Sequence, residues 1–176
     1  MVMLIWLIGI SGAGKTTLGL RLKEYYRKKE RFAYMIDGDE VRAVFDEDLG
    51  FSRADRTANI KRIILAAYVL DRCGIDAIVC NISPFQELRD LARIKIAGYT
   101  EIYLKKTLAE SINKDVKGVY AANKGKTDLI GLDIQFDEPQ APDLIIEVEQ
   151  ESVEQSLEKI IRFIEDKERN AKNSIC

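Results

Sequence analysis

The stretch Gly9-Ile10-Ser11-Gly12-Ala13-Gly14-Lys15-Thr16 fits G-x-x-x-x-G-K-[ST], the pattern of a phosphate-binding loop (P-loop). A short apolar run, Met3 to Ile8, comes directly before it and has the length of a buried strand. The residues that follow, Thr17 to Lys29, are predicted to form a helix. Because a functional loop of this kind lies between a strand and a helix, this context favours a nucleoside triphosphate site over a glycine-rich turn with an incidental lysine.

The residue types in this loop suit a polyphosphate. Glycines let the backbone curve around an anion without side-chain clashes. The exposed N–H groups and the N-terminus of the following helix attract negative charge. Lys15 is expected to reach the β- and γ-phosphates, and the Thr16 hydroxyl to hold Mg²⁺. The predicted triphosphate-binding residues are Gly9, Ser11, Gly12, Ala13, Gly14, Lys15, Thr16 and Thr17.

Apolar runs and helical stripes alternate along the rest of the chain. The further strands expected are Phe32–Ile36, Asp76–Asn81, Glu101–Leu104 and Asp143–Val148, and the further helices are Ser52–Arg72, one opened by Ser83-Pro84, and Glu151–Lys167. This order predicts a three-layer α/β fold of the P-loop NTPase type, with a parallel sheet of about five strands and helices on both faces. Ligands are then expected at the carboxyl ends of the strands.

Local signals refine the predicted helices. Ser52 and Asp55 resemble a capping box at the start of one helix, and Gly74 is expected to cap its end. Pro84 is expected at the first position of the next helix, with Ser83 as its N-cap and Gln86 at the third position. In the last helix, the side chains expected to face inward are Val153, Leu157, Ile160, Ile161 and Ile164.

The polar segment from Lys105 to Pro142 separates the last two expected strands. A long insertion at this place is usually functional, so we expect a lid over a bound ligand. With 176 residues and 47% hydrophobic residues, the chain is predicted to form a single domain, residues 1–176, with a P-loop.

Charge and composition exclude several classes of function. There are 27 Lys and Arg against 29 Asp and Glu, a net charge of −2, which argues against a nucleic-acid or membrane-binding surface. The longest apolar run, Val2 to Ile10, is too short to span a bilayer and lacks the features of a signal peptide. Three cysteines without metal spacing indicate reduced thiols and a cytoplasmic protein. With no histidine, a general base has to be a carboxylate or another group.

The second expected strand ends in Asp37-Gly38-Asp39. Phosphoryl transfer needs a metal and a carboxylate near the attacking hydroxyl, and two residues this close can both face the cleft. Asp37 is expected to help hold Mg²⁺ and Asp39 to act on the hydroxyl, although both could be plain turn residues around Gly38. A small-molecule kinase is therefore favoured. A GTPase is not, because the guanine motif N-K-x-D is broken at Asn123-Lys124-Gly125-Lys126.

Several pieces then occur in the order in which adenylyl-sulfate kinases carry them. The pieces are Gly9–Thr17, Asp37–Arg42, Asp48–Arg56, Asn59–Arg62, Ile82–Phe85, Lys114–Tyr120, and Gly131–Asp133 followed by Pro139 and Pro142. From Trp6 to Ile146 the chain thus resembles this family, and the stretch D-L-G-F-S-x-x-D-R is its most specific part. The resemblance implies an ATP- and Mg²⁺-dependent kinase of sulfate assimilation. It would phosphorylate the 3′-hydroxyl of adenosine 5′-phosphosulfate (APS) to give 3′-phosphoadenosine 5′-phosphosulfate.

The resemblance also implies roles for single residues. Lys15 and Asp39 would be catalytic, Asp39 lying near the accepting hydroxyl. Lys114, Asp115 and Lys117 would belong to the lid, with Lys114 on the ATP side. The residues implied to bind the acceptor are Asp39, Arg42, Phe51, Arg56, Asn59, Ile82, Ser83, Lys117 and Leu129. Arg42, Arg56 and Asn59 match residues that hold the phosphosulfate, and Phe51 matches an aromatic that stacks on adenine.

Each role has a structural alternative. Arg56 and Asn59 share one face of a predicted helix and could be an exposed polar face. Phe51 could be a core contact ahead of the Ser52 cap. Ser83, which can be phosphorylated in some family members, could be only an N-cap.

The chain departs from the family pattern beside the acceptor base. Leu129-Ile130 stand where the family has Phe-Thr, so an aliphatic side chain takes the place of the second stacking ring. Such a change leaves open a relative that acts on another nucleotide, such as cytidine diphosphoramidate in capsule biosynthesis. A third possibility is a non-catalytic nucleotide-binding module. Family members are often dimeric, so a homodimer is a possible assembly.

Overall fold

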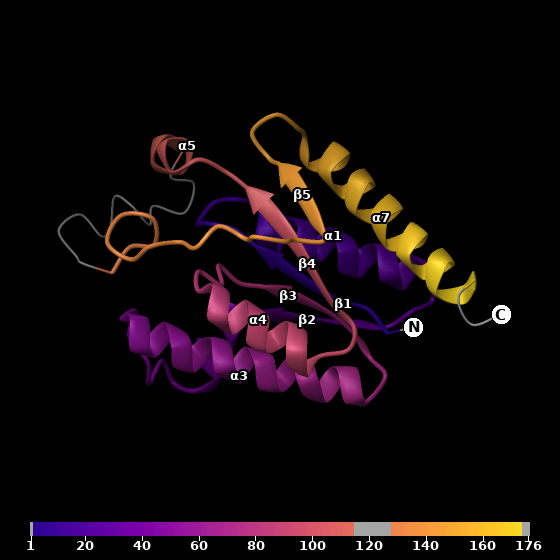
Figure 1. The fold of residues 1–176 in the computed structure, drawn as a ribbon, viewed down its shortest axis with the longest axis horizontal. Coiled ribbons are helices and arrows are strands. Elements are labelled where there is room, and N and C mark those ends of the chain that lie inside the picture. Colours follow the sequence, from indigo (N-terminus) through magenta and orange to yellow (C-terminus); the bar gives the residue numbers. More distant parts are fainter. Residues whose placement is uncertain (1, 115–127, 174–176) are drawn as a thin grey trace.

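A parallel sheet of five strands forms the middle layer of the molecule, in the order β2-β3-β1-β4-β5 (Figure 1). The computed structural model describes residues 2–114 and 128–173. The strands are β1 (Leu4–Ile8), β2 (Ala33–Asp37), β3 (Asp76–Cys80), β4 (Tyr99–Lys105) and β5 (Leu144–Glu147). Each pair of neighbouring strands runs parallel. The predicted sheet of about five parallel strands is confirmed.

Helices cover both faces of this sheet (Figure 1). They are α1 (Lys15–Lys28), α2 (Gly38–Val44), α3 (Arg53–Arg72), α4 (Gln86–Lys95), α5 (Leu108–Lys114) and α7 (Val153–Asn173). The pair α1 and α7 packs on one face, and the pair α3 and α4 packs on the other. The carboxyl ends of the strands, with α5 beyond them, lie opposite the edge that holds the two chain ends.

Strand β1 explains why the first apolar run is unbroken. Leu4, Trp6 and Ile8 pack in the core under α3 and α4, whereas Ile5 and Leu7 pack in the core under α1 and α7. All five are at most 1% exposed. A central strand with helices on both faces needs apolar residues on both sides, so the alternation seen in half-exposed strands is absent.

The predicted ends of α3 are confirmed. The Ser52 hydroxyl accepts a hydrogen bond of 3.2 Å from Asp55 N–H, which caps the first turn. At the other end Gly74 has φ of +75°, and Ile75 N–H donates to the Leu70 carbonyl at 2.9 Å. This left-handed residue with a bond back over the last turn is a Schellman motif, which glycine adopts at little cost.

The prediction that Ser83-Pro84 opens a helix was wrong. Helix α4 begins at Gln86, two residues later, and Phe85 is its N-cap. Ser83 has φ of +46°, a left-handed conformation that does not lead into a helix. The first free N–H of α4, on Gln86, instead donates to the Asp137 carboxylate at 3.2 Å. A residue 51 positions away therefore supplies the cap that local sequence was expected to supply.

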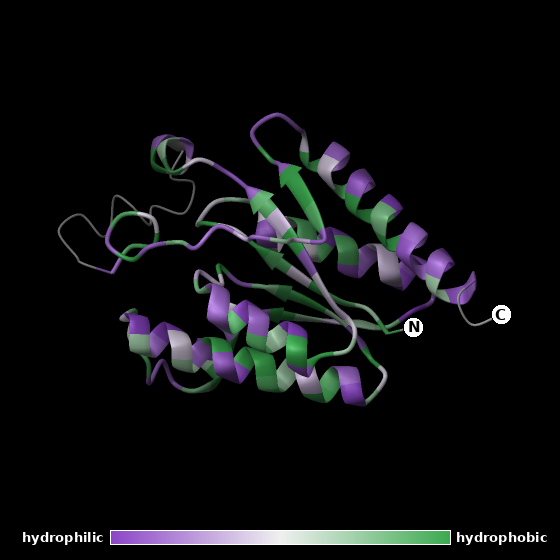
Figure 2. Ribbon diagram, viewed as in Figure 1, coloured by the Kyte–Doolittle hydropathy of each residue, from purple (hydrophilic) through white to green (hydrophobic). Residues whose placement is uncertain are grey.

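The last helix, α7, is shifted from its predicted bounds. It begins at Val153 rather than at Glu151 and continues to Asn173. Ser152 and Gln155 cap each other reciprocally, which fixes this start. Val153 is 39% exposed, so its predicted inward position was wrong. The other predicted inward residues are buried or partly buried: Leu157, Ile160, Ile161 and Ile164. Figure 2 shows the alternating hydrophobic and hydrophilic residues along this helix.

Two helices were not expected from the sequence. Asp37 is the N-cap of α2 and Asp39 lies in its first turn, so the alternative of plain turn residues was wrong. Within the expected lid, α5 follows β4 directly. Residues 128–134 form a tight turn, in which Gly131 N–H donates to the Ile134 carbonyl at 2.8 Å. The broken guanine motif at 123–126 lies outside the described residues.

Candidate active site

The glycine-rich loop connects β1 to α1 at the carboxyl edge of the sheet. Gly9, Gly12 and Gly14 have φ of +148°, +73° and +89°, which disfavour residues with a side chain. A Cβ at Gly9 would lie 2.5 Å from the Leu104 carbonyl oxygen, so β4 approaches the loop closely. Lys15 Nζ lies over the loop and donates to the carbonyls of Gly9 and Ile10, both at 2.8 Å. The loop therefore has the curved backbone of a phosphate cradle.

The predicted metal residues lie side by side. Thr16 Oγ1 donates to Asp37 Oδ2 at 3.0 Å, and the other Asp37 oxygen accepts Asp39 N–H at 2.9 Å. A hydroxyl and a carboxylate at the edge of a phosphate cradle are hard oxygen donors of the kind that Mg²⁺ takes beside a triphosphate. The two residues thus fit a magnesium ion. Asp37 also caps α2, so one side chain links the loop to the helix that carries Asp39.

Asn59 ties α3 to this helix. Its Nδ2 donates to the Gly38 carbonyl at 3.1 Å, and the residue is only 3% exposed. Its Oδ1 is buried without a partner among the described residues. The alternative of an exposed polar face was therefore wrong for Asn59, which anchors the start of α2 and keeps one acceptor unused.

Two arginines lie close to the ring of Phe51. The guanidinium carbons of Arg42 and Arg56 are 4.8 Å and 5.3 Å from its ring centroid. Phe51 is 55% exposed, so the alternative of a core contact was wrong. Arg42 Nη1 donates to the carbonyls of Leu49 and Gly50 at 3.0 Å and 2.7 Å, which holds the loop that carries Phe51. The result is an exposed aromatic face with two cations beside it.

The charge of Asp39 acts on the pKa values of both arginines beside Phe51. Burial, and then the neighbouring Arg42, lower the pKa of Arg56, while Asp128 and Asp39 oppose that shift. Burial also lowers the pKa of Arg42, and Asp39 is the first of the groups that oppose it. Asp39 itself is exposed. Two partly buried guanidiniums and an exposed carboxylate therefore face one region, which suits an anionic ligand with a hydroxyl group.

Residues 128–134 lie on one side of the cluster formed by Phe51, Arg42 and Arg56. Arg56 Nη2 donates to the Asp128 carbonyl at 2.8 Å, so the neighbouring Leu129 lies near the start of α3. Leu129 is partly exposed, and its N–H donates to the Asp133 carboxylate at 3.0 Å. A Cβ at Gly131 would lie 3.0 Å from Leu108, which places this turn against α5.

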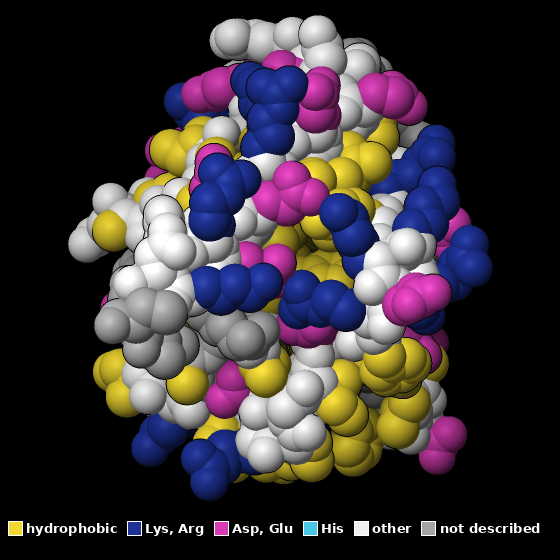
Figure 3. Space-filling view, turned by 90° about the vertical axis from the view of Figure 1, so that its right-hand side faces the viewer, with side chains coloured by type: hydrophobic (Ala, Val, Ile, Leu, Met, Phe, Trp, Pro, Cys, Tyr) yellow, Lys and Arg dark blue, Asp and Glu magenta, His cyan; other side chains and the backbone are white. Residues whose placement is uncertain are grey.

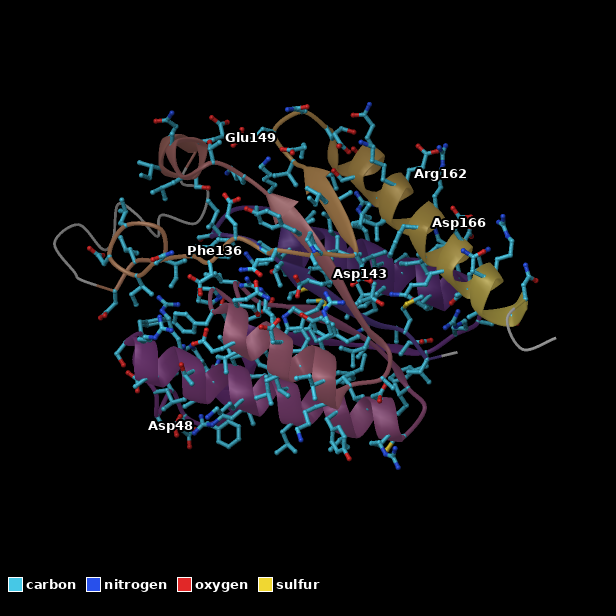
Figure 4. All side chains as sticks on the ribbon, in the orientation of Figure 1. Asp48, Phe136, Asp143, Glu149, Arg162 and Asp166 are labelled. Atoms are coloured by element: carbon cyan, nitrogen blue, oxygen red, sulfur yellow. The ribbon has the colours of Figure 1, made fainter. Side chains whose placement is uncertain are left out.

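Ser83 is held in the core, in the loop after β3. It is fully buried, and its Oγ accepts a hydrogen bond of 2.8 Å from Trp6 Nε1. Arg89 Nη1 donates to the Ser83 carbonyl at 2.7 Å, and Arg89 Nη2 donates to the Asp137 carbonyl at 2.7 Å. The same arginine lies beside Phe136, which stacks on Tyr103 at the end of β4 (Figure 4). The N-cap alternative for Ser83 was wrong, and the bond from Trp6 fixes this serine instead.

The remaining predicted residues are only partly described. Ile82 is partly buried, one residue before Ser83. Lys114 is the last residue of α5, and nothing of its side chain is described. Asp115 and Lys117 lie outside the described residues. The loop residues Ser11, Ala13 and Thr17 lie in or directly after the glycine-rich loop, with Ala13 buried.

Sequence reasoning missed several residues that shape this site. Trp6, Arg89 and Asp137 hold the loop after β3, and Lys106 lies beside the glycine-rich loop, where its Nζ donates to the Gly12 carbonyl at 3.3 Å. Only Lys106 had a usable signal, because it follows a predicted strand at the edge where the loop lies. The two backbone carbonyls that Arg89 binds belong to residues 6 and 48 positions away, and no local pattern predicts them.

The opposite edge of the sheet carries hollows of its own. One has a volume of about 640 Å³ and is lined by Phe32, Asp76 and Lys172, among others, at the amino ends of the strands. Figure 3 shows a recess on this side, with a hydrophobic floor and charged side chains around it. None of the predicted site residues lies there.

Two kinds of feature are absent from the described residues. In residues 2–114 and 128–173, no helix has the length and apolar content needed to cross a membrane. The same part of the chain holds no group of three or more Cys, Asp or Glu residues placed to bind a metal.

The fold and the site together define a P-loop kinase: a five-stranded parallel sheet, a glycine-rich loop after β1, and a carboxylate pair at the end of β2. Residues 1–147 match the family model of Adenylylsulphate kinase, so the chain belongs to the adenylyl-sulfate kinase family. An adenylyl-sulfate kinase of Geotalea uraniireducens is 41% identical over 167 residues, which cover 93% of this chain and 80% of the relative. That of Halothermothrix orenii is 36% identical, covering 93% and 89%.

A solved structure agrees with the sequence relatives. The APS kinase of Mycobacterium tuberculosis, in complex with AMPPNP and APS, has a TM-score of 0.86 and 32% identity. The likeness covers 93% of this chain and 98% of that one. The likeness therefore extends over almost the whole of both chains.

Proposed function

We propose that this protein transfers the γ-phosphoryl group of ATP to the 3′-hydroxyl of APS. The observation that supports this acceptor is the exposed ring of Phe51 close to Arg42 and Arg56, with Asp39 acting electrostatically on both arginines. An aromatic face can stack on a nucleobase, and guanidinium groups can bind the anionic end of the same molecule. An acceptor with a base, a hydroxyl and an anionic tail matches these three elements.

The donor site is assigned to the glycine-rich loop. Backbone N–H groups and the N-terminus of α1 bind the triphosphate, and Lys15 exchanges the Gly9 and Ile10 carbonyls for phosphate oxygens. Thr16 and Asp37, whose oxygens lie side by side, would hold the magnesium ion of Mg·ATP. When bound, the metal neutralises charge that develops on the phosphates.

On the acceptor side, Asp39 orients the 3′-hydroxyl. As the new P–O bond forms, the bond between the γ-phosphorus and the oxygen left on ADP breaks, and the hydroxyl proton passes to Asp39 or to water. Phe51 stacks on the base, and Leu129 covers its other side. Arg42 and Arg56 hold the phosphosulfate, and Asn59 positions the start of α2 through its bond to the Gly38 carbonyl. The partly buried Ile82, with the buried Ser83 behind it, forms the wall beside the acceptor.

The test is a panel of acceptors assayed with Mg·ATP and the purified protein. We expect ADP release that depends on APS, with the new phosphate on the 3′-oxygen. Cytidine diphosphoramidate belongs in the same panel, because Leu129 replaces the second stacking ring of the family pattern and imposes fewer constraints on the base. Turnover with the cytidine compound and none with APS would assign the relative of capsule biosynthesis. ATP binding without turnover on any acceptor would leave a nucleotide-binding module.

We further propose that the chain works as one domain, in the cytoplasm, in sulfate assimilation, and as a homodimer. A candidate surface for pairing is formed by the neighbouring helices α2 and α3, where the side chains of Val44, Phe45, Leu65 and Val69 are exposed. Exposed apolar side chains that gather on one face commonly mark a contact between proteins. Analytical ultracentrifugation measures the mass of the protein in solution and so distinguishes a monomer from a dimer. A monomer at micromolar concentration would contradict the dimer without touching the proposed reaction.

A further inference from the structure

Lys106 lies beside the glycine-rich loop, although no signature of the loop includes it. Its Nζ donates to the Gly12 carbonyl at 3.3 Å, and a Cβ added at Gly12 would lie 3.5 Å from the same nitrogen. The approach follows from the packing of β4 on the loop, where the Leu104 carbonyl lies 2.5 Å from the position of a Cβ at Gly9. The end of β4 therefore delivers an ammonium group to the loop.

The next residue fixes the backbone of Lys106. Thr107 N–H and Oγ1 both donate to Glu149 Oε1, at 2.6 Å and 2.8 Å. Glu149 comes from the segment between β5 and α7, so the two chain segments are joined directly after β4 (Figure 4). The Thr107 hydroxyl also accepts Glu110 N–H at 3.2 Å and caps α5. Thr107, the residue directly after Lys106, is therefore held by both Glu149 and the first turn of α5.

The adjacent lysine points elsewhere. Lys105 Nζ is 3.1 Å from Glu147 Oε1 in an exposed ion pair on neighbouring strands. No carboxylate pairs with Lys106 in the part of the chain that the structure describes. Two consecutive lysines therefore have different surroundings, one neutralised by a carboxylate and one at an anion-binding loop.

We propose that Lys106 is a second phosphate-binding lysine, which contacts the donor triphosphate together with Lys15. A lysine ammonium has three donors, so it can keep the Gly12 carbonyl and bind phosphate oxygens. In the sheet order, β4 lies on the side of β1 away from β2, which carries Asp37 and leads to Asp39. Lys106 therefore approaches the donor and not the acceptor. The proposal rests on the proposed function only in that ATP occupies the loop.

The test compares Lys106→Gln with the matched control Lys105→Gln and with Lys106→Arg. Displacement of a fluorescent ATP analogue by ATP, ADP and adenosine gives the affinity of each variant. We expect Lys106→Gln to weaken ATP and ADP by about tenfold or more, as the loss of a charge-assisted hydrogen bond requires. Its adenosine affinity, its KM for the acceptor and its thermal midpoint should match wild type. Lys106→Arg should retain most of the ATP affinity because it keeps the charge.

Three results would overturn the proposal. The first is an ATP affinity of Lys106→Gln within twofold of wild type. The second is an equal loss in Lys105→Gln, which would reflect general surface charge. The third is an equal loss for adenosine, which would indicate a structural role on the loop. If the Lys106 effect is present and APS is not turned over, only the proposed acceptor fails; if APS is turned over and ATP affinity is unchanged, only Lys106 is misassigned.

Discussion

Arg56 and Asp128 are joined across 72 positions of sequence by a hydrogen bond of 2.8 Å between Nη2 and the backbone carbonyl. The same guanidinium donates through Nε to the Phe51 carbonyl, also at 2.8 Å. One side chain thus fixes both the stacking residue and the residue before Leu129. Arg56 therefore sets the spacing of the two proposed walls of the base site, in addition to any contact with the anionic end of the acceptor.

Arg56→Lys should raise the KM for the acceptor by about ten- to a hundredfold, because an ammonium cannot bridge the Phe51 and Asp128 carbonyls with the same planar geometry. The KM for ATP should stay within about twofold, since no described contact of Arg56 touches the loop. Arg53→Lys, on the same turn of α3 and paired with the exposed Glu87, is the control. An acceptor KM equal to wild type would remove Arg56 from the site.

Asp39→Asn should lower kcat by about 10²- to 10⁴-fold, the usual contribution of a group that handles a proton. The Kd for Mg·ATP should change little, because the ground-state ATP contacts belong to the loop and to the Thr16–Asp37 pair. Steady-state kinetics with equilibrium ATP binding separates the two effects. Glu40→Gln, the exposed neighbour on α2, should keep wild-type kcat. Unchanged turnover of Asp39→Asn would rule out the assigned role.

Ser83→Ala should lower the free energy of unfolding by about 1–3 kcal/mol, because it leaves the buried Trp6 indole N–H without its acceptor. Urea unfolding measures the change. Trp6→Phe should lower the free energy of unfolding less in the Ser83→Ala background than in the wild type, because the Trp6–Ser83 hydrogen bond is already absent there. Additive losses would mean that the Trp6–Ser83 bond contributes nothing to stability.

Asp143 makes the stability depend on acid pH. Burial raises the pKa of its carboxyl, but the Glu101 N–H bond, Lys167 and Arg93 together lower it below the ordinary value. A carboxyl whose folded pKa is depressed stabilises the fold above its unfolded pKa, about 3.9, and that contribution disappears as the pH falls through the folded pKa. Asp143→Asn should therefore cost about 1 kcal/mol at pH 7 and almost nothing well below pH 4.

Urea unfolding of this variant at several pH values checks the dependence. Asp166→Asn is the control, since Asp166 is 65% exposed and its pair with Arg169 is weak at 3.5 Å (Figure 4). It should change stability by less than about 0.5 kcal/mol at any pH. A loss at Asp143 that persists undiminished at low pH would show that packing, and not charge, is responsible.

Much of the fold follows from local patterns. The five strands, the helix after the loop, the Ser52 cap and the Gly74 stop were predicted because each depends on residues a few positions apart. The glycine-rich loop was predicted for the same reason: the positive φ angles of Gly9, Gly12 and Gly14 need that residue type. The start of α4 was missed because its cap, Asp137, lies 51 positions from Gln86. Helix α2 was missed because it is short and its cap doubles as a predicted metal ligand.

By itself, the sequence determined the sheet, the phosphate-binding loop and the set of residues that the family resemblance assigns to the site. Only the tertiary structure decided how those residues are held. It buried Ser83 under Trp6, used Arg56 to join Phe51 to Asp128, and brought Lys106 to the loop beside Lys15. The physical reason is that hydrogen bonds of this kind join side chains and carbonyls that meet only when distant strands pack into one sheet, and no local spacing encodes them.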